Sequence, residues 1–199
     1  PDLGRRTTRK VALRTLPVLF ALYVVAYLDR ANVGFAKLRM SDALGFDDAV
    51  FGLGVGLFFV GYLVLEIPGA LIVERWSARK WFARILVTWG ACSMGMAFVT
   101  TPTEFYVLRF LLGLAEAGFF PGIVFYLSEW FPAEQRGRAM SRFMIAIPLS
   151  AAFGNPLSSW LLTFDGTAGL AGWQWLFLLE GIPSVLLGVS VLFFLTDRP

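Results

Sequence analysis

The chain has 199 residues, of which 57% are hydrophobic and only 16% are charged, and its mean hydropathy is +0.69. Soluble domains carry about 25% charged residues, so this composition excludes a water-soluble protein and indicates a membrane protein. The only cysteine is Cys92 and histidine is absent, which excludes an intrachain disulfide and leaves no zinc or iron site. We therefore expect no cofactor and no metal.

Apolar runs of membrane-spanning length follow one another along the chain. At about 20 residues per helical span, they predict six helices, near residues 16–37, 51–74, 81–101, 104–130, 138–163 and 173–195. The first run follows a basic segment, as a signal peptide does, but it is long, has no small-residue cleavage site and leads into a second span. We expect a basic tail over 1–15, an all-α six-helix transmembrane bundle over 16–195, and the start of a loop over 196–199.

Basic residues gather in alternate connections between the predicted spans. They are Arg5, Arg6, Arg9, Lys10 and Arg14 before the first span, Arg75, Arg79, Lys80 and Arg84 after the second, and Arg136, Arg138 and Arg142 after the fourth. The positive-inside rule then predicts that both ends of the segment are cytoplasmic. The net charge of +3 is interpreted as this topology signal and not as a nucleic-acid-binding patch.

Two of the predicted spans are interrupted by pairs of opposite charges. Asp29 and Arg30 lie in the first span, and Arg109 and Glu116 lie in the fourth. A charge at the bilayer centre costs roughly 3 kcal/mol, so such residues usually face a bundle interior and line a pathway. Arg109 and Glu116 are two helical turns apart, about 10 Å along one face, and we expect Gly113 between them to leave room on that face.

These four residues offer two guanidiniums for an anion and two carboxylates for protons. Burial disfavours a charged carboxylate and a neighbouring arginine favours it, so Asp29 and Glu116 can titrate while they pair with Arg30 and Arg109. Protonation would free the guanidiniums to grip a carboxylate of the solute. This pattern predicts symport of protons and an anion. The alternative is that the ion pairs only fix the bundle, and Glu180 in the sixth span is as readily a structural group as a coupling one.

The second and fifth predicted spans are rich in glycine and proline. The order of spans, with charges in the first of each three, is typical of inverted three-helix repeats. Gly52 and Gly56 form a pair at the spacing that lets two membrane helices pack closely. Pro148 and Pro156 are each expected to loosen or kink the fifth span, because proline removes a helical hydrogen bond.

Several segments resemble known transporters. The loop 74–80 resembles the signature loop of the major facilitator superfamily, with Glu74 in place of its aspartate and Ser77 in place of its second glycine. Segments 27–36, 61–62, 109–122, 154–156 and 177–181 together resemble the anion:cation symporter family from end to end. Members of that family have twelve spans, whereas this chain stops at Pro199, where a central loop would begin. We expect it to be the N-terminal six-helix half.

The resemblance implies roles for individual residues. Asp29 and Glu116 match the proton-binding acids of the family, Arg30 and Arg109 match the arginines that pair with them, and Arg30 also contacts substrate. Tyr27 and Tyr62 match cavity tyrosines that hydrogen-bond the solute, and Asn155 is added from its place in the fifth span. Charged residues of two loops are expected to hold one conformation closed, namely Glu74, Arg75, Arg79, Lys80, Arg136 and Arg138.

The expected function is secondary active transport in a plasma membrane, specifically a bacterial inner membrane. The solute would be a small organic anion of the tartrate, sugar acid or phthalate type, carried with protons by alternating access. The expected partners are this solute, protons, lipid and the C-terminal half, with no nucleic acid, and no enzymatic activity is expected. Three alternatives stay open: a non-transporting membrane module, an inactive half-transporter, and a uniporter of the same anions.

Overall fold

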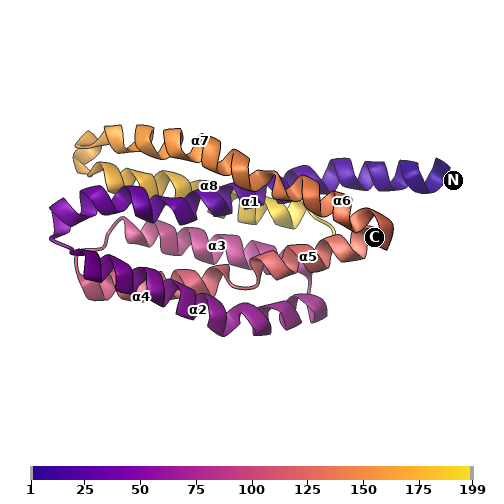
Figure 1. Ribbon diagram of the computed structural model, residues 1–199, viewed down its shortest axis with the longest axis horizontal. Coiled ribbons are helices and arrows are strands. Elements are labelled where there is room, and N and C mark those ends of the chain that lie inside the picture. Colours follow the sequence, from indigo (N-terminus) through magenta and orange to yellow (C-terminus); the bar gives the residue numbers. More distant parts are fainter. Residues whose placement is uncertain (1, 198–199) are drawn as a thin grey trace.

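The computed structural model describes the backbone of residues 2–197 and the side chains of residues 10–30 and 32–197, and the described part is helical with no strands. Figure 1 shows the helices running side by side along one axis. They are α1 (Asp2–Leu44), α2 (Asp48–Arg75), α3 (Ala78–Met96), α4 (Pro102–Glu116), α5 (Phe119–Trp130), α6 (Ala133–Met144), α7 (Ala146–Leu161) and α8 (Gly172–Phe194), with single 3-10 turns η1 (Leu162–Phe164) and η2 (Thr167–Gly169). The all-α fold predicted from the sequence is confirmed.

Within the described residues, five helical stretches are long and apolar enough to cross a membrane. They are Lys10–Leu44, Asp48–Arg75, Pro102–Trp130, Ala133–Phe164 and Gly172–Phe194. The third predicted span, α3, is not among them, because Arg79, Lys80 and Arg84 lie near its beginning. It nevertheless packs inside the bundle against α8 and α4. The first helix is longer than predicted, since α1 continues through the expected tail to Asp2.

The fourth and fifth predicted spans are each broken into two helices, and a proline explains each break. Pro121 has no N–H to donate to the carbonyl of Ala117, the residue just after α4, and Gly118 then turns the chain with a positive φ of 78°. Pro148 likewise cannot bond to the carbonyl of Met144, the last residue of α6. Pro156 causes no such break, because α7 continues through this residue.

Glycines set the contact between α2 and α4, but they are not the pair expected from spacing. Gly52 and Gly56 have no other atom within 4 Å of where a Cβ would lie, so no described helix packs against them. A Cβ on Gly61 would instead strike the backbone of α4, and one on Gly113 would strike the backbone of α2. The two helices therefore meet at backbone distance through Gly61 and Gly113.

Buried apolar side chains form two clusters, one toward each end of the bundle. One is built around Trp89 and Phe119, and the other around Phe105 and Phe177. Four buried polar residues, each on a different helix, separate the two clusters. In each of these helices, residues of one cluster come before the polar residue and residues of the other cluster come after it. We call these four residues the polar layer: Asp29, Ser93, Arg109 and Glu180.

The two ends of the bundle differ in charge. In Figure 1 both chain ends lie at the same end as the α2–α3 and α5–α6 connections. The basic residues of these connections therefore gather there, including Arg75, Arg79, Arg136 and Arg138. The opposite end holds the α1–α2 and α7–α8 connections, with Asp47 and Asp165.

Candidate solute and proton site

An ion pair between α1 and α4 lies at the centre of the candidate site. The guanidinium Nε of Arg30 is 2.7 Å from Oε2 of Glu116, and this guanidinium also lies 5.4 Å from the ring centre of Tyr62. The side chain of Glu116 is 3% exposed, whereas that of Arg30 is 40% exposed. The other carboxylate oxygen of Glu116 is buried with no hydrogen-bond partner. The pair thus joins a buried acid to a cation that an incoming group can reach.

A small cavity lies beside this ion pair. Its volume is about 260 Å³, and the lining residues are Tyr23, Ala26, Tyr27, Arg30, Tyr62, Phe119, Phe120 and Met144. Three of the predicted solute contacts, Tyr27, Arg30 and Tyr62, are therefore brought together from α1 and α2. Arg30 is the one cation in an otherwise apolar and phenolic lining, which suits a small anion whose remaining surface stacks on aromatic rings.

The second acid, Asp29, has different partners from those predicted. It is 2% exposed, it accepts a hydrogen bond of 2.6 Å from Nε1 of Trp89, and the hydroxyl of Ser93 also donates to it. The expected ion pair between Asp29 and an arginine is not formed, because both carboxylate oxygens face α3. Sequence reasoning missed Trp89 and Ser93. The available signal was their spacing, since two side-chain donors four residues apart share one helical face in the middle of an apolar span.

Arg109 lies on α4 in the polar layer and is 5% exposed. Its guanidinium is 4.8 Å from the ring centre of Phe58, and its Nε has no hydrogen-bond partner. Arg109 and Glu116 are both buried on α4, as expected from their spacing. The space expected beside Gly113 is filled by the backbone of α2 around Phe58, so that prediction is wrong. The cavity described above lies beside Arg30 instead.

Asn155 is not brought to this cavity. It is exposed on α7 and is not among the residues that line the cavity. Figure 1 shows α7 and α2 on opposite sides of the bundle.

The predicted gating loops form contacts that differ from those expected. The carboxylate of Asp197, just past α8, accepts hydrogen bonds from the Ser77 hydroxyl at 2.6 Å and from the backbone N–H of Arg79 at 2.9 Å. The guanidinium of Arg79 lies 3.8 Å from the same carboxylate. The acid that pairs with this loop is therefore Asp197 and not Glu74, which is exposed with its neighbours Arg75 and Lys80.

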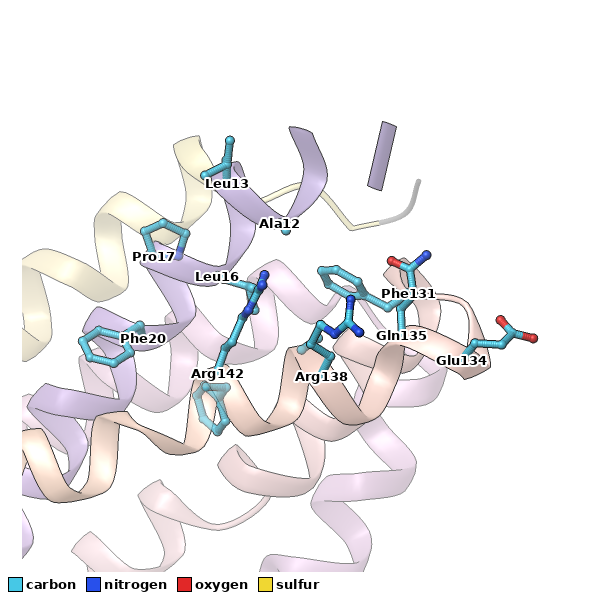
Figure 2. Close-up of a pocket in the computed structure, with 12 residues that line it drawn as sticks. Ala12, Leu13, Leu16, Pro17, Phe20, Phe131, Glu134, Gln135, Arg138 and Arg142 are labelled. Carbon is cyan, nitrogen blue, oxygen red and sulfur yellow. The ribbon is translucent and has the colours of Figure 1, made fainter. Parts of the chain in front are cut away.

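The second gating loop bonds mainly to backbone. Arg136 donates hydrogen bonds to the backbone carbonyls of Phe131 and Ser128, at 3.0 and 2.7 Å. Its side chain therefore joins the beginning of α6 to the end of α5. Arg138 instead borders a larger cavity of about 870 Å³ between α6 and the beginning of α1. Figure 2 shows Arg142 extending toward Leu16 and Arg138 next to Phe131 in this cavity.

The fold and the buried charges define the class of protein to which the chain belongs. The model of the Major Facilitator Superfamily matches residues 19–199, so the chain belongs to this family of membrane transporters and is not an enzyme. No group of three metal-ligating side chains is found among the residues that the structure describes.

Two curated relatives of the chain are named as transport proteins. The chain is 56% identical over 198 residues to a protein of Agrobacterium vitis named "Putative tartrate transporter", covering 100% of this chain and 46% of that protein. It is 41% identical over 191 residues to the "Inner membrane transport protein RhmT" of Escherichia coli K12, covering 96% of this chain and 44% of the relative. The chain thus spans less than half the length of these relatives.

Solved structures agree on the fold. A bacterial homologue of the human lysosomal transporter Spinster, in an inward-facing and unoccupied conformation, matches with a TM-score of 0.79 at 19% identity, over 96% of this chain and 44% of that one. The proton:xylose symporter XylE bound to 6-bromo-6-deoxy-D-glucose matches with a TM-score of 0.77 at 16% identity, over 96% and 46%. The likeness supports a six-helix half of the transporter fold.

Proposed function

We propose that this chain forms the N-terminal half of a proton-coupled symporter of small organic carboxylates. The observation that carries the proposal is the ion pair between Arg30 and Glu116 at the edge of a cavity lined by Tyr27 and Tyr62. The relatives named as tartrate transporters support a solute of the tartrate type, with sugar acids and phthalate as related candidates.

The ion pair supplies a mechanism for coupling. While Glu116 is ionised, its carboxylate occupies Arg30 and competes with any carboxylate of the solute. Protonation of Glu116 removes the competing charge and leaves the guanidinium free to bind the solute in a bidentate way. Protons and solute therefore favour one another's binding, and an inward proton gradient drives accumulation.

Asp29 and Arg109 complete the set of coupling groups. Asp29 is held by two neutral donors and not by a cation, so its ionised form has no neighbouring charge in direct contact. We propose that it takes up a second proton. Arg109 has an unpartnered Nε in the polar layer and would pair with whichever acid is ionised during the cycle.

The rest of the solute site would come from a C-terminal six-helix half. The relatives are more than twice as long as this chain, and α2 and α7 both present apolar side chains outward, such as Leu63 at 70% and Phe153 at 71% exposure. Such surface is covered either by lipid or by further protein. Asn155, exposed on α7, would reach the solute from the face that meets the second half.

The basic end of the bundle would face the cytoplasm of a bacterial inner membrane. The gathering of arginine and lysine at one end supports this orientation through the positive-inside rule, and one relative is named as an inner membrane protein. Residues 16–195 would then form the transmembrane half. The contact of Asp197 with Ser77 and Arg79 would hold the α2–α3 loop as one gating element at the cytoplasmic face.

The test is uptake of labelled solute by proteoliposomes that contain the full-length protein and an imposed inward proton gradient. We expect accumulation above equilibrium for the native protein and for Glu129→Gln, which makes the same change at an exposed position. Glu116→Gln should still equilibrate solute but not concentrate it. Equal accumulation by Glu116→Gln would indicate that this acid carries no coupling proton, and downhill uptake alone by the native protein would favour a uniporter.

A further inference from the structure

A second buried acid lies away from the solute cavity, in a contact between α1, α7 and α8. Glu180 on α8 is 5% exposed, and Asn32 on α1 and Ser158 on α7 are fully buried against it. The amide Nδ2 of Asn32 donates to Oε2 of Glu180. The hydroxyl oxygen of Ser158 lies 3.3 Å from Oε1 of Glu180 and 3.2 Å from Oδ1 of Asn32. These three side chains form a closed ring, which we call the Glu180 ring.

The donors and acceptors of the Glu180 ring do not balance if Glu180 is ionised. A serine hydroxyl has a single hydrogen, so Ser158 can donate to Asn32 or to Glu180 but not to both. One acceptor oxygen would then face the lone pairs of Ser158 inside the protein, and a buried unsatisfied acceptor is costly.

A proton on Oε1 of Glu180 completes the ring. Glu180 then donates to Ser158, Ser158 donates to Asn32, and the amide of Asn32 donates to Oε2 of Glu180. Every hydrogen has one acceptor. Turning the amide of Asn32 by 180° does not remove the need for the proton, because its oxygen would then face Oε2 of Glu180, and two acceptors at that distance repel unless a hydrogen lies between them.

Among the residues whose side chains the structure describes, no cation is placed to stabilise an ionised Glu180. On α8 it is the only titratable side chain, and α7 and η1 carry none. On α3, which packs against α8, the half-buried Cys92 is the titratable group at this depth, and Arg79, Lys80 and Arg84 lie near the other end of that helix. On α1 the group that faces Glu180 is Asp29, one turn before Asn32, and its negative charge disfavours a second one. Arg30, its neighbour, is paired with Glu116.

We propose that Glu180 is a separate proton-binding site, which holds its proton through the Glu180 ring and fastens α7 and α8 to α1. The inference rests on the proposed function only for the use of that proton in transport. Loss of the proton would leave two acceptors opposed across the ring and would loosen the contact of α7 with its neighbours. The bound species is a proton and not a metal ion, because Asn32 directs its N–H group at the carboxylate.

Infrared spectroscopy of the full-length protein in detergent at neutral pH, without solute, tests the proposal. The spectrum of the native protein minus that of Glu180→Gln should show the carbonyl band of a protonated carboxylic acid. The same subtraction with Glu129→Gln, an exposed acid, should show ionised carboxylate bands only. Ionised bands in the Glu180 difference would overturn the proposal, and this result is independent of whether the protein transports any solute.

Thermal unfolding supplies a second readout. The amide of Glu180→Gln can donate to Ser158 and accept from Asn32 without taking up a proton. This variant should therefore unfold at the native temperature at acidic pH, where the unfolded chain also holds the proton, and at a higher temperature than the native protein at neutral pH. Because the native protein would bind this proton when folded and release it when unfolded, its stability should fall more steeply than that of Glu180→Gln as the pH rises. Equal pH slopes would contradict the proposal, as would stabilisation of the native protein but not of Glu180→Gln by added sodium chloride relative to potassium chloride.

Discussion

Replacing Glu116 by glutamine should tighten anion binding at alkaline pH. In the native protein the anion must displace the Glu116 carboxylate from Arg30, 2.7 Å away. Surface ion pairs are worth about 1 kcal/mol or less, whereas breaking a buried pair costs about 3–5 kcal/mol. The side chain of Arg30 is 40% exposed, so the pair lies between these two cases. We therefore expect ionised Glu116 to weaken the free energy of anion binding by about 1.4 kcal/mol, which corresponds to a tenfold change in affinity.

The assay is calorimetric titration of the solute into the purified full-length protein across a range of pH. The native affinity should weaken about tenfold from acidic to alkaline pH, because ionised Glu116 competes with the solute, and 1.4 kcal/mol is a factor of ten. Glu116→Gln should bind near the acidic affinity of the native protein and should lack this tenfold change, and any smaller pH dependence left in it would report the proton proposed on Asp29. Glu129→Gln, an exposed control, should follow the native curve. Weaker binding by Glu116→Gln at alkaline pH would refute the reasoning, because it would mean that Glu116 supports the anion and does not compete with it.

Three further changes test the surroundings of the site by denaturant unfolding in detergent. Trp89→Phe should lower the free energy of unfolding by at least about 2 kcal/mol, because it leaves the buried Asp29 with one donor fewer. Gly113→Ala should prevent folding or destabilise strongly, since its Cβ would strike the backbone of α2. Asp197→Ala should cost about 1 kcal/mol by removing an acceptor from the first turn of α3, and it should expose the α2–α3 loop to protease.

Each change has a matched control. Trp173 is as buried as Trp89 but its Nε1 has no partner, so Trp173→Phe removes the same volume without a hydrogen bond. Gly137 lies in a helix with open space around it, and Gly137→Ala should stabilise by up to about 1 kcal/mol. Asp42→Ala removes an exposed acid. Effects no larger than these controls would contradict the roles given to Trp89, Gly113 and Asp197.

Much of the fold could be predicted because membrane helices are defined by the length of apolar runs. The breaks in the fourth and fifth spans could not be located from hydropathy, since apolar residues continue across them. They follow from backbone chemistry: Pro121 lies four residues after Ala117, the residue that caps α4, and Pro148 lies four residues after Met144, the last residue of α6. Pro156 has the same chemistry but interrupts nothing, so proline alone does not decide between a break and a tolerated position.

The charged residues could be found from the sequence, but their partners could not. Because a charge inside an apolar span is costly, Asp29, Arg30 and Glu116 can be recognised as candidate functional residues whichever way their helices are rotated. Which residues they meet depends on the rotation of each helix, and α3 carries no interrupting charge in its middle to indicate that its face binds Asp29. The same reason explains Asn155, because nothing in one span tells which of its faces meets the rest of the bundle.

The most direct test of the central claim is to follow proton entry into proteoliposomes of the full-length protein with an internal pH dye when tartrate, a sugar acid or phthalate is added outside. The account predicts that one of these anions acidifies the interior, that the effect persists in Glu129→Gln, and that it disappears in Glu116→Gln. Solute uptake without acidification, or acidification that survives Glu116→Gln, would contradict proton coupling through the Arg30–Glu116 pair.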